Sequence, residues 1–222
     1  GFFNAAALET AEGSGKKQAS SGMEIPGKME GTPEQILHRM GYTVSYNSTT
    51  KTPNWVAWHL TADHVSGSSQ RNQEMFQEDH EVKNGPTNSD YYNSGFDRGH
   101  MCPAGDNKWN RKALQETFYF TNMCPQVHSL NSGGWNDLEI ACRKWAKKYG
   151  GVYIVCGPVP QRSPIRTIGR NKVWVPREFF KVVLCLRGEG SPKAIGFIYP
   201  NASASRKMFS YAMSVDEVER IT

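Results

Sequence analysis

An amphipathic segment between residues 133 and 149 constrains the fold of this chain more than any other feature. Large apolar side chains recur in it at spacings of three and four residues, namely Trp135, Leu138, Cys142, Trp145 and Tyr149. That period predicts an α-helix with one apolar face. Gly150 and Gly151 supply a stop, basic residues crowd the last turns, and Ser132 is placed to cap the start. A helix of this kind must pack against another layer of structure.

Short β-branched and aromatic runs on both sides of this helix predict that other layer. Residues 42–46 and 55–60 predict an antiparallel pair of strands. Further strands are expected at 118–122, 152–156, 173–175, 179–186 and 194–199. Short helices are expected at 32–40, 108–118 and 204–213, with another beginning at 214–217. This order of elements predicts an α+β fold with a mainly antiparallel or mixed central sheet flanked by helices.

Length and composition bound the number of domains and the kind of partner. The 222 residues suffice for one domain, placed at 34–222, after a flexible leader at 1–33 that is rich in Gly, Ser and Lys. The net charge of +5 mildly favours an anionic partner. No apolar run is long enough to cross a bilayer as a helix. Residues 1–8 are too short and uncharged for a complete signal peptide, so export is not visible in the sequence.

The five cysteines contain no CxxC pair, which argues against a structural zinc site of the usual spacing. Cys102 and Cys124 occur in the similar contexts HMCP and NMCP. They could form a disulfide in an oxidising compartment or remain buried thiols, because geometry and not sequence decides between the two.

The segment Asp97-Arg98-Gly99-His100 carries the first candidate chemistry. The imidazole of His100, with an ordinary pKa of about 6.5, could accept a proton from water at neutral pH. Asn131 offers an amide oxygen, a weak uncharged ligand with which a Mg²⁺ ion would keep most of its waters. Glu139 could bind the ion directly or hold those waters, and we favour the second role. These groups together indicate cleavage of phosphodiester bonds.

Two arginines and an amide could bind the substrate. The guanidinium groups of Arg98 and Arg143 can fork onto phosphate oxygens and stabilise the charge that develops there. Asn122 could donate or accept a hydrogen bond beside them.

Several of these residues also have simpler structural interpretations. Asp97 could take part in the chemistry or, together with Gly99, shape a turn that presents its neighbours. Asn131 could cap the long helix, and Glu139 could form an ion pair with Arg143 one helical turn away. The remaining histidines are interpreted as structural or solvated: His38, His59, His64, His80 and His128.

Two long motifs resemble the DNA/RNA non-specific endonuclease family, which includes secreted bacterial sugar-nonspecific nucleases and mitochondrial endonuclease G. They are FDRGHMCPAGDN at 96–107 and TFYFTNMCPQVHSLNSGGWNDLE at 117–139. Weaker similarity continues through YIVCGP, VWVPREFFKVVL and YAMSVDEVE.

The resemblance implies a ββα-metal site, also called a His-Me finger, in which two strands and a helix hold one Mg²⁺ ion. Mn²⁺ or another divalent ion can substitute in such sites. By this resemblance His100 is the general base, Asn131 the metal ligand and Glu139 the residue beside the metal waters. It also assigns Arg98, Arg143 and Asn122 to the catalytic and substrate-binding set. Water then attacks in line, a 3′ oxygen leaves, and products carry 5′ phosphates.

The chain departs from the family pattern in two ways. Cys102 and Cys124 stand where relatives carry small apolar residues, and the chain ends at Thr222, where relatives continue. A homodimer of the kind seen in relatives is therefore an open expectation, and no inhibitor protein is identified. DNA and RNA are both expected substrates. A general nuclease endangers its host's cytoplasm, so the expected location is outside a bacterial cell or in its periplasm.

Two rival functions follow from the same residues. One is a catalytically silent nuclease fold that binds nucleic acid or a protein, against which the intact His100, Asn131 and Glu139 argue. The other is a cysteine hydrolase that uses Cys102, which would need a thiol of low pKa. Pro103 follows this cysteine directly, so the helix N-terminus that usually activates such a thiol is not expected there.

Overall fold

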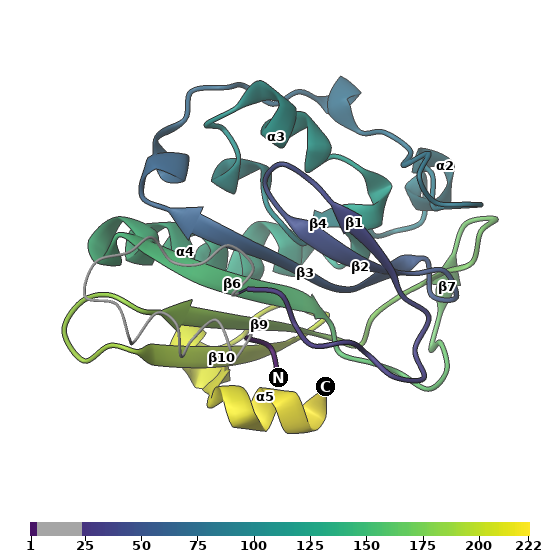
Figure 1. Ribbon diagram of the computed structural model, residues 1–222. Helices are drawn as coiled ribbons and strands as arrows, with labels where there is room; N and C mark the ends of the chain where they lie inside the picture. Colours follow the sequence, from purple (N-terminus) through teal and green to yellow (C-terminus); the bar gives the residue numbers. More distant parts are fainter. Residues whose placement is uncertain (4–23) are drawn as a thin grey trace.

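The computed structural model describes residues 1–3 and 24–222 and shows an antiparallel sheet between two layers of helices (Figure 1). Within that part of the chain the central sheet has seven strands. In spatial order they are β1 (Gln35–His38), β2 (Thr43–Asn47), β3 (Thr52–Thr61), β6 (Gly151–Pro158), β9 (Glu178–Cys185), β10 (Lys193–Pro200) and β11 (Ala212–Met213). Every neighbouring pair is antiparallel, which confirms the predicted α+β class.

Two hairpins and the helices surround this sheet. The hairpins are β4 (Asp97–His100) with β5 (Met123–Gln126), and β7 (Thr167–Ile168) with β8 (Val173–Trp174). The α-helices are α2 (Asn88–Tyr91), α3 (Arg111–Glu116), α4 (Trp135–Tyr149) and α5 (Val215–Ile221). Shorter helical turns are η1 (Asp63–Ser66), η2 (Gln73–Met75), η3 (Ala104–Asp106), η4 (Phe120–Asn122), η5 (Leu130–Gly134) and η6 (Met208–Tyr211). Among the described residues, no helix combines the length and apolar character needed to cross a membrane.

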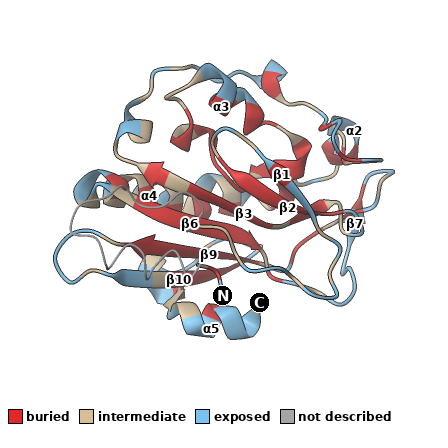
Figure 2. Cartoon of the chain, in the orientation of Figure 1, coloured by how far each residue is buried: buried red, intermediate tan, exposed pale blue. Residues whose placement is uncertain are grey.

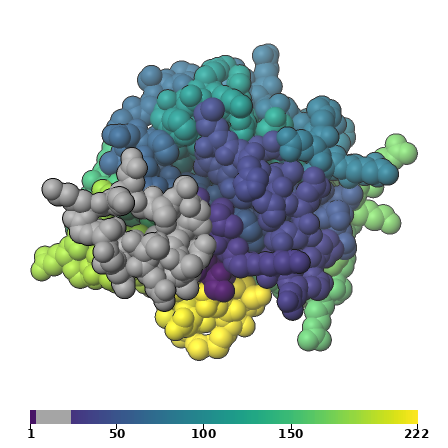
Figure 3. All heavy atoms as spheres, viewed as in Figure 1, coloured from purple at the N-terminus to yellow at the C-terminus, as the bar shows by residue number. Residues whose placement is uncertain are grey.

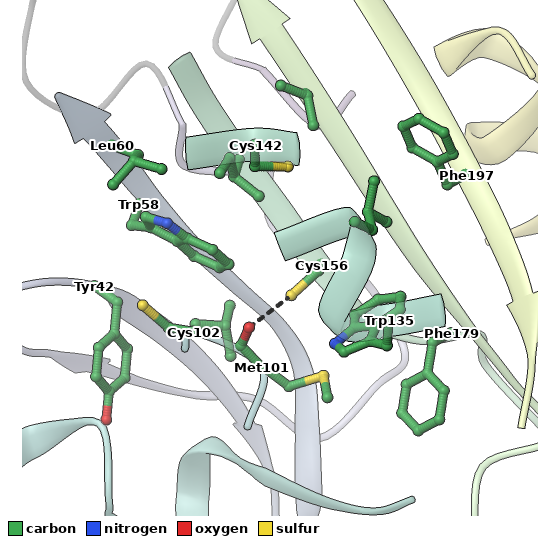
Figure 4. Close-up of a cluster of buried hydrophobic side chains, with 14 of the residues drawn as sticks. Tyr42, Trp58, Leu60, Met101, Cys102, Trp135, Cys142, Cys156, Phe179 and Phe197 are labelled. Atoms are coloured by element: carbon green, nitrogen blue, oxygen red, sulfur yellow. Dashed lines mark hydrogen bonds between the residues drawn. The ribbon is translucent and has the colours of Figure 1, made fainter. Parts of the chain in front are cut away.

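The central strands are buried on both faces, as the red strands in Figure 2 show. Successive residues of a strand point to opposite faces, so β9 serves two separate cores. Phe179 and Val183 join the cluster that packs on α4, whereas Phe180 and Val182 join the cluster that packs on α5. Figure 4 shows the first cluster, in which Trp135 of α4 lies against the β9 face.

The predicted long helix is confirmed as α4, but its start differs from the prediction. Gly150 adopts the left-handed conformation that ends the helix, with φ of 79°. Ser132 was expected to cap the start and does not, because its hydroxyl donates to the His128 carbonyl instead. The preceding turn η5 already supplies an acceptor, since the Trp135 amide donates to the Leu130 carbonyl. The amide at the start of α4 is therefore hydrogen bonded to a backbone carbonyl and not to a capping side chain.

Most predicted strands are confirmed, and the errors lie at short segments whose partners decide their conformation. The helix expected at 32–40 is wrong, because 35–38 pairs with β2 as an edge strand. The strand expected at 118–122 is wrong in place, since η4 occupies 120–122 and the strand follows at 123–126. The segment 173–175 gives the short strand β8, which pairs with β7 outside the central sheet.

Two of the other predicted helices are found, and one is not. The helices predicted at 108–118 and from 214–217 appear as α3 and α5. Ser214 and Glu217 form a reciprocal capping box at the start of α5. The helix expected at 204–213 is wrong, because this segment forms η6 and then the edge strand β11.

The described ends of the predicted leader contact the domain. Residues 4–23 lie outside the described part of the chain. The Phe2 ring is buried 5.1 Å from the Phe180 ring, and the Phe2 amide donates to Glu219 Oε1 at 2.9 Å. Figure 3 accordingly shows the purple N-terminal residues seated against the yellow helix α5.

Candidate active site

The Asp97–His100 segment is strand β4 and not the turn expected from the sequence. It pairs with β5 in an antiparallel register that sets Gly99 opposite Cys124 and His100 opposite Met123. A Cβ atom at position 99 would collide with the Gln126 side chain, so this crossing requires glycine. With α4 following through η5, the chain forms a β-hairpin and helix, the ββα arrangement implied by the family resemblance.

His100 lies in an aromatic pocket at the end of β4. Its ring meets Phe118 edge-on at 4.8 Å and Phe76 at 5.7 Å between ring centres. Burial, reinforced by the positive charges of Arg71 and Arg98, lowers the pKa of His100 to about 3. Its Nε2 atom is buried and has no hydrogen-bond partner within the described residues. The pKa of His100 therefore lies below the ordinary value used in the sequence analysis, and the ring is uncharged at physiological pH.

Asp97 holds Asn131 and His128 together. Its Oδ2 atom accepts from Asn131 Nδ2 at 2.9 Å and from His128 Nδ1 at 2.8 Å. Asn131 therefore does not cap the long helix, and that alternative is wrong. Because the amide nitrogen is held by Asp97, the orientation of the Asn131 carbonyl oxygen is set. That oxygen has no hydrogen-bond partner among the described residues, so it is available as a ligand.

Arg98 lines an open groove of about 620 Å³ beside Asp97 and Asn131. Its guanidinium lies 3.6 Å over the Phe76 ring and donates to Asn88 Oδ1 at 3.0 Å and to Gln73 Oε1 at 2.8 Å. Both acceptors are neutral amides, so the positive charge is not cancelled by an ion pair. The groove can therefore attract an anion such as a phosphate group.

Arg143 and Glu139 do not form the ion pair considered above. Arg143 instead donates from a terminal guanidinium nitrogen to Asp106 Oδ1 at 3.0 Å, and Trp58 Nε1 donates to the other oxygen of the same carboxylate at 3.0 Å. Asp106 is buried, and this burial raises the pKa of its carboxyl although Arg143 opposes the shift. Arg143 is thus tied to the protein and not to the groove that Arg98 lines.

Glu139 of α4 is half-buried and lies within electrostatic range of the buried Lys181. Burial raises the pKa of Glu139 to about 7, against the opposing effect of Lys181. Lys181 comes from β9 and its ammonium lies 4.6 Å over the Trp135 ring. Burial disfavours its charge, but the surrounding thiols and carboxyls outweigh this effect and raise its pKa. Lys181 is the only Lys or Arg among the described residues with no exposed surface, and it interacts electrostatically with Glu139.

The side chain of Asn122, expected from the sequence to contact substrate, makes hydrogen bonds within the protein instead. Its side chain is completely buried, with Oδ1 accepting from the Cys102 amide at 3.0 Å. Its Nδ2 donates to the carbonyls of Cys102 and Thr117, both at 2.9 Å. With all these groups occupied, Asn122 holds the backbone just after His100, and its amide atoms are engaged within the protein.

The cysteines do not form the disulfide that was considered, and they do not form a nucleophilic site. All five are free and buried, including Cys102 and Cys124. Burial raises the pKa of both these thiols well above the ordinary range. A buried thiol of high pKa is a poor nucleophile, which argues against the cysteine hydrolase.

The donor set fits a divalent ion that keeps most of its waters. Within residues 1–3 and 24–222, no three His, Cys, Asp or Glu side chains are grouped closely enough to cage a metal. The carbonyl oxygen of Asn131 and the carboxyl of Glu139 are hard oxygen donors, and neither has a hydrogen-bond partner in the described part of the chain. Few protein ligands and retained waters are the pattern that Mg²⁺ prefers.

Sequence reasoning missed part of the groove. Arg71, Phe76 and Tyr92 come from the polar region 64–96, in which no elements could be placed. His128 was grouped with the structural histidines, yet its ring is hydrogen bonded to Asp97 at the groove. Its position three residues before Asn131 was the one available signal, because that spacing is short enough to bring both side chains to one acceptor.

Comparison with known proteins agrees with this fold and identifies the family. The family model for DNA/RNA non-specific endonucleases matches residues 19–222. The zebrafish protein named mitochondrial nuclease EXOG is 38% identical over 208 residues, covering 86% of this chain and 61% of the relative. Human mitochondrial endonuclease G is 33% identical over 199 residues, covering 84% of this chain and 67% of the relative. The chain belongs to the DNA/RNA non-specific endonuclease family, which confirms the resemblance.

A solved structure supports the fold independently. The crystal structure of an EndoG/EndoGI complex matches with a TM-score of 0.78 and 30% identity, covering 85% of this chain and 83% of the other. The chain spans about three fifths of the length of the zebrafish relative. The expected secreted or periplasmic bacterial location is wrong, because the curated relatives from zebrafish, humans and yeast are named as mitochondrial nucleases.

Proposed function

We propose that this chain is a metal-dependent, sequence-nonspecific endonuclease that hydrolyses phosphodiester bonds of DNA and RNA. The observation that carries the proposal is that one ββα unit carries both His100 and Asn131, each with an available acceptor atom. His100 is held neutral with a buried nitrogen that lacks a partner, and Asn131 is held by Asp97 with its carbonyl oxygen open. Membership in the endonuclease family supports nuclease activity for the chain.

Each residue has a task that its environment supports. His100 accepts a proton from the attacking water, since it is unprotonated at neutral pH. Arg98 binds a phosphate oxygen with a guanidinium whose hydrogen-bond partners among the described residues are neutral amides. Asn131 would bind Mg²⁺ directly and Glu139 would hold its waters. A bound ion would supply electrostatic stabilisation of the transition state and of the leaving 3′ oxygen. Departure of that oxygen would leave 5′ phosphates on the products.

The test compares plasmid DNA and RNA incubated with Mg²⁺, with Mn²⁺ and with EDTA. Both polymers should be degraded only with a divalent ion, and His100→Ala should abolish degradation. His80→Ala is the matched control, because His80 is exposed and is not part of the groove lining. Degradation that survives EDTA or His100→Ala would refute the proposal. Binding of both polymers without cleavage would favour the silent scaffold, and inhibition by thiol alkylation alone would favour a cysteine enzyme.

We also infer that the protein works in mitochondria, as the names of its relatives indicate for those proteins. Fractionation of cells that express the full-length protein with a C-terminal tag should recover it with mitochondrial markers. Recovery in the cytosol or the medium would contradict this inference.

A further inference from the structure

Tyr92 presents an aromatic ring to solvent on the wall of the groove that Arg98 lines. The side chain is 74% exposed, whereas its neighbour Tyr91 is 4% exposed and packs with Phe120. Among the described residues, no other ring or cation packs on Tyr92. An aromatic side chain that is left uncovered beside a site is available to a ligand.

The backbone that carries Tyr92 is firmly held. The Tyr92 amide donates to the Asn88 carbonyl at 3.0 Å, which closes helix α2. Thr87 and Asp90 form a reciprocal capping box at the other end of this helix. Asp90 also accepts from the backbone and side-chain nitrogens of Asn171 at 3.0 and 2.8 Å, which ties α2 to the β7–β8 hairpin beside it (Figure 1). The backbone of Tyr92 is therefore held in place by these hydrogen bonds, so its ring is exposed from an ordered helix end and not from a loose loop.

The groove around Tyr92 combines positive charge with further aromatic surface. Arg71 and Arg98 line it, and the Arg98 guanidinium has only neutral amide partners. Phe96 lines it too, and the Arg166 guanidinium lies 5.0 Å from the Phe96 ring. The carboxylate in the lining, Asp97, already accepts two hydrogen bonds. Cationic groups that follow a phosphate backbone, with a free ring at the side, are the composition of a site for single strands.

We propose that Tyr92 stacks on an unpaired nucleobase of the strand being cut, and thereby makes this chain favour single-stranded or locally unpaired nucleic acid over duplex. The inference rests on the proposed nuclease function and adds a substrate class to it. Base faces inside a duplex are covered by their neighbours, so only an unpaired nucleotide can offer its face to the ring. Stacking is tolerant of base identity, which agrees with cleavage at any sequence.

The test measures kcat/KM on a short single strand and on the duplex of the same sequence, with Mg²⁺. Tyr92→Ala should lower the single-strand value about 5- to 100-fold and the duplex value by no more than about twofold. Tyr92→Phe should behave as wild type, because the ring is kept. Phe209→Ala is the matched control, since Phe209 is 63% exposed and lies outside the groove, and it should change neither value. Equal losses on both substrates, no loss on either, or loss with Tyr92→Phe would each overturn the proposal.

A binding measurement separates this inference from the nuclease proposal. Fluorescence anisotropy of a labelled single strand in EDTA would compare His100→Ala with the double variant that also carries Tyr92→Ala. Weaker binding by the double variant supports stacking even if the wild type proves unable to cut. Equal affinity of the two proteins overturns stacking while leaving metal-dependent cleavage intact.

Discussion

Replacing Asp97 with alanine tests how the metal ligand is positioned. The change removes the Oδ2 acceptor that holds Asn131 Nδ2 at 2.9 Å, so the amide of Asn131 becomes free to rotate. Loss of a partner that orients a metal ligand typically weakens metal affinity or activity by about 10- to 100-fold. Because tenfold corresponds to about 1.4 kcal/mol, the expected cost in the activated complex is about 1.4 to 2.7 kcal/mol.

His128→Ala is the control variant, because it removes the other hydrogen bond to Asp97 and leaves the Asp97–Asn131 bond in place. It removes the second hydrogen bond to the same Asp97 oxygen, but the His128 side chain is 77% exposed and solvent screens the interaction. Exposed pairs contribute about 0.2–1 kcal/mol, so we expect less than about a sixfold effect. Asp97→Asn keeps a carbonyl acceptor for Asn131 and should lie between the two variants.

The assay is the initial rate of DNA cleavage as a function of Mg²⁺ concentration for the three variants. Asp97→Ala should need more Mg²⁺ for half-maximal rate, whereas His128→Ala should keep nearly the wild-type requirement. If His128→Ala is as damaging as Asp97→Ala, or if Asp97→Ala leaves the Mg²⁺ dependence unchanged, Asp97 does not act through Asn131.

Three further predictions concern charge, burial and pH. The pKa of His100 is about 3 in the folded chain and about 6.5 in the unfolded chain, so between these pH values only the unfolded chain binds a proton at this ring. The free energy of unfolding should therefore fall on acidification by up to about 1.4 kcal/mol per pH unit. Urea unfolding at pH 5 and 7 should show a smaller difference for His100→Gln than for the wild type. Arg143→Met leaves the buried carboxylate of Asp106 without its ion-pair partner and should cost about 3 kcal/mol, measured by chemical unfolding, with part recovered when Asp106→Asn is added. Asn122→Ala leaves buried backbone groups without partners and should lower unfolding free energy by about 3 kcal/mol, while KM for nucleic acid in the folded protein stays unchanged; a raised KM with full stability would restore a substrate contact.

The predictable part of the fold is the part whose pattern repeats locally. Helix α4 carries its apolar residues at helical spacing and ends in glycine, so it could be read directly. The strands at 152–156 and 179–186 are buried on both faces and form continuous β-branched and aromatic runs. The segment 35–38 has no such run, and it becomes a strand only because β2 lies beside it. Its conformation is set by a tertiary partner that local sequence does not encode.

The candidate site divides in the same way. His100 and Asn131 stand in long motifs, so their residue types indicated the chemistry. What the motifs do not specify is which groups are already occupied by other contacts. The amide of Asn122 is hydrogen bonded to the backbone of Cys102 and Thr117, because the chain that follows β4 runs alongside Asn122 in the fold. A motif therefore predicts where a polar side chain stands more reliably than whether its atoms are free.

The conformation of the Asp97–His100 segment explains why the groove stays positive. Asp97 precedes Arg98, and in a turn the two side chains could neutralise each other. In strand β4 the Arg98 and His100 side chains both contact Phe76, whereas the Asp97 carboxylate contacts Asn131 and His128, although Asp97 and Arg98 both line the groove. The Asp97 carboxylate orients Asn131, the proposed metal ligand, and the Arg98 guanidinium keeps neutral partners and can bind phosphate. A segment interpreted from the sequence as a turn is thus a strand whose adjacent residues make separate sets of contacts.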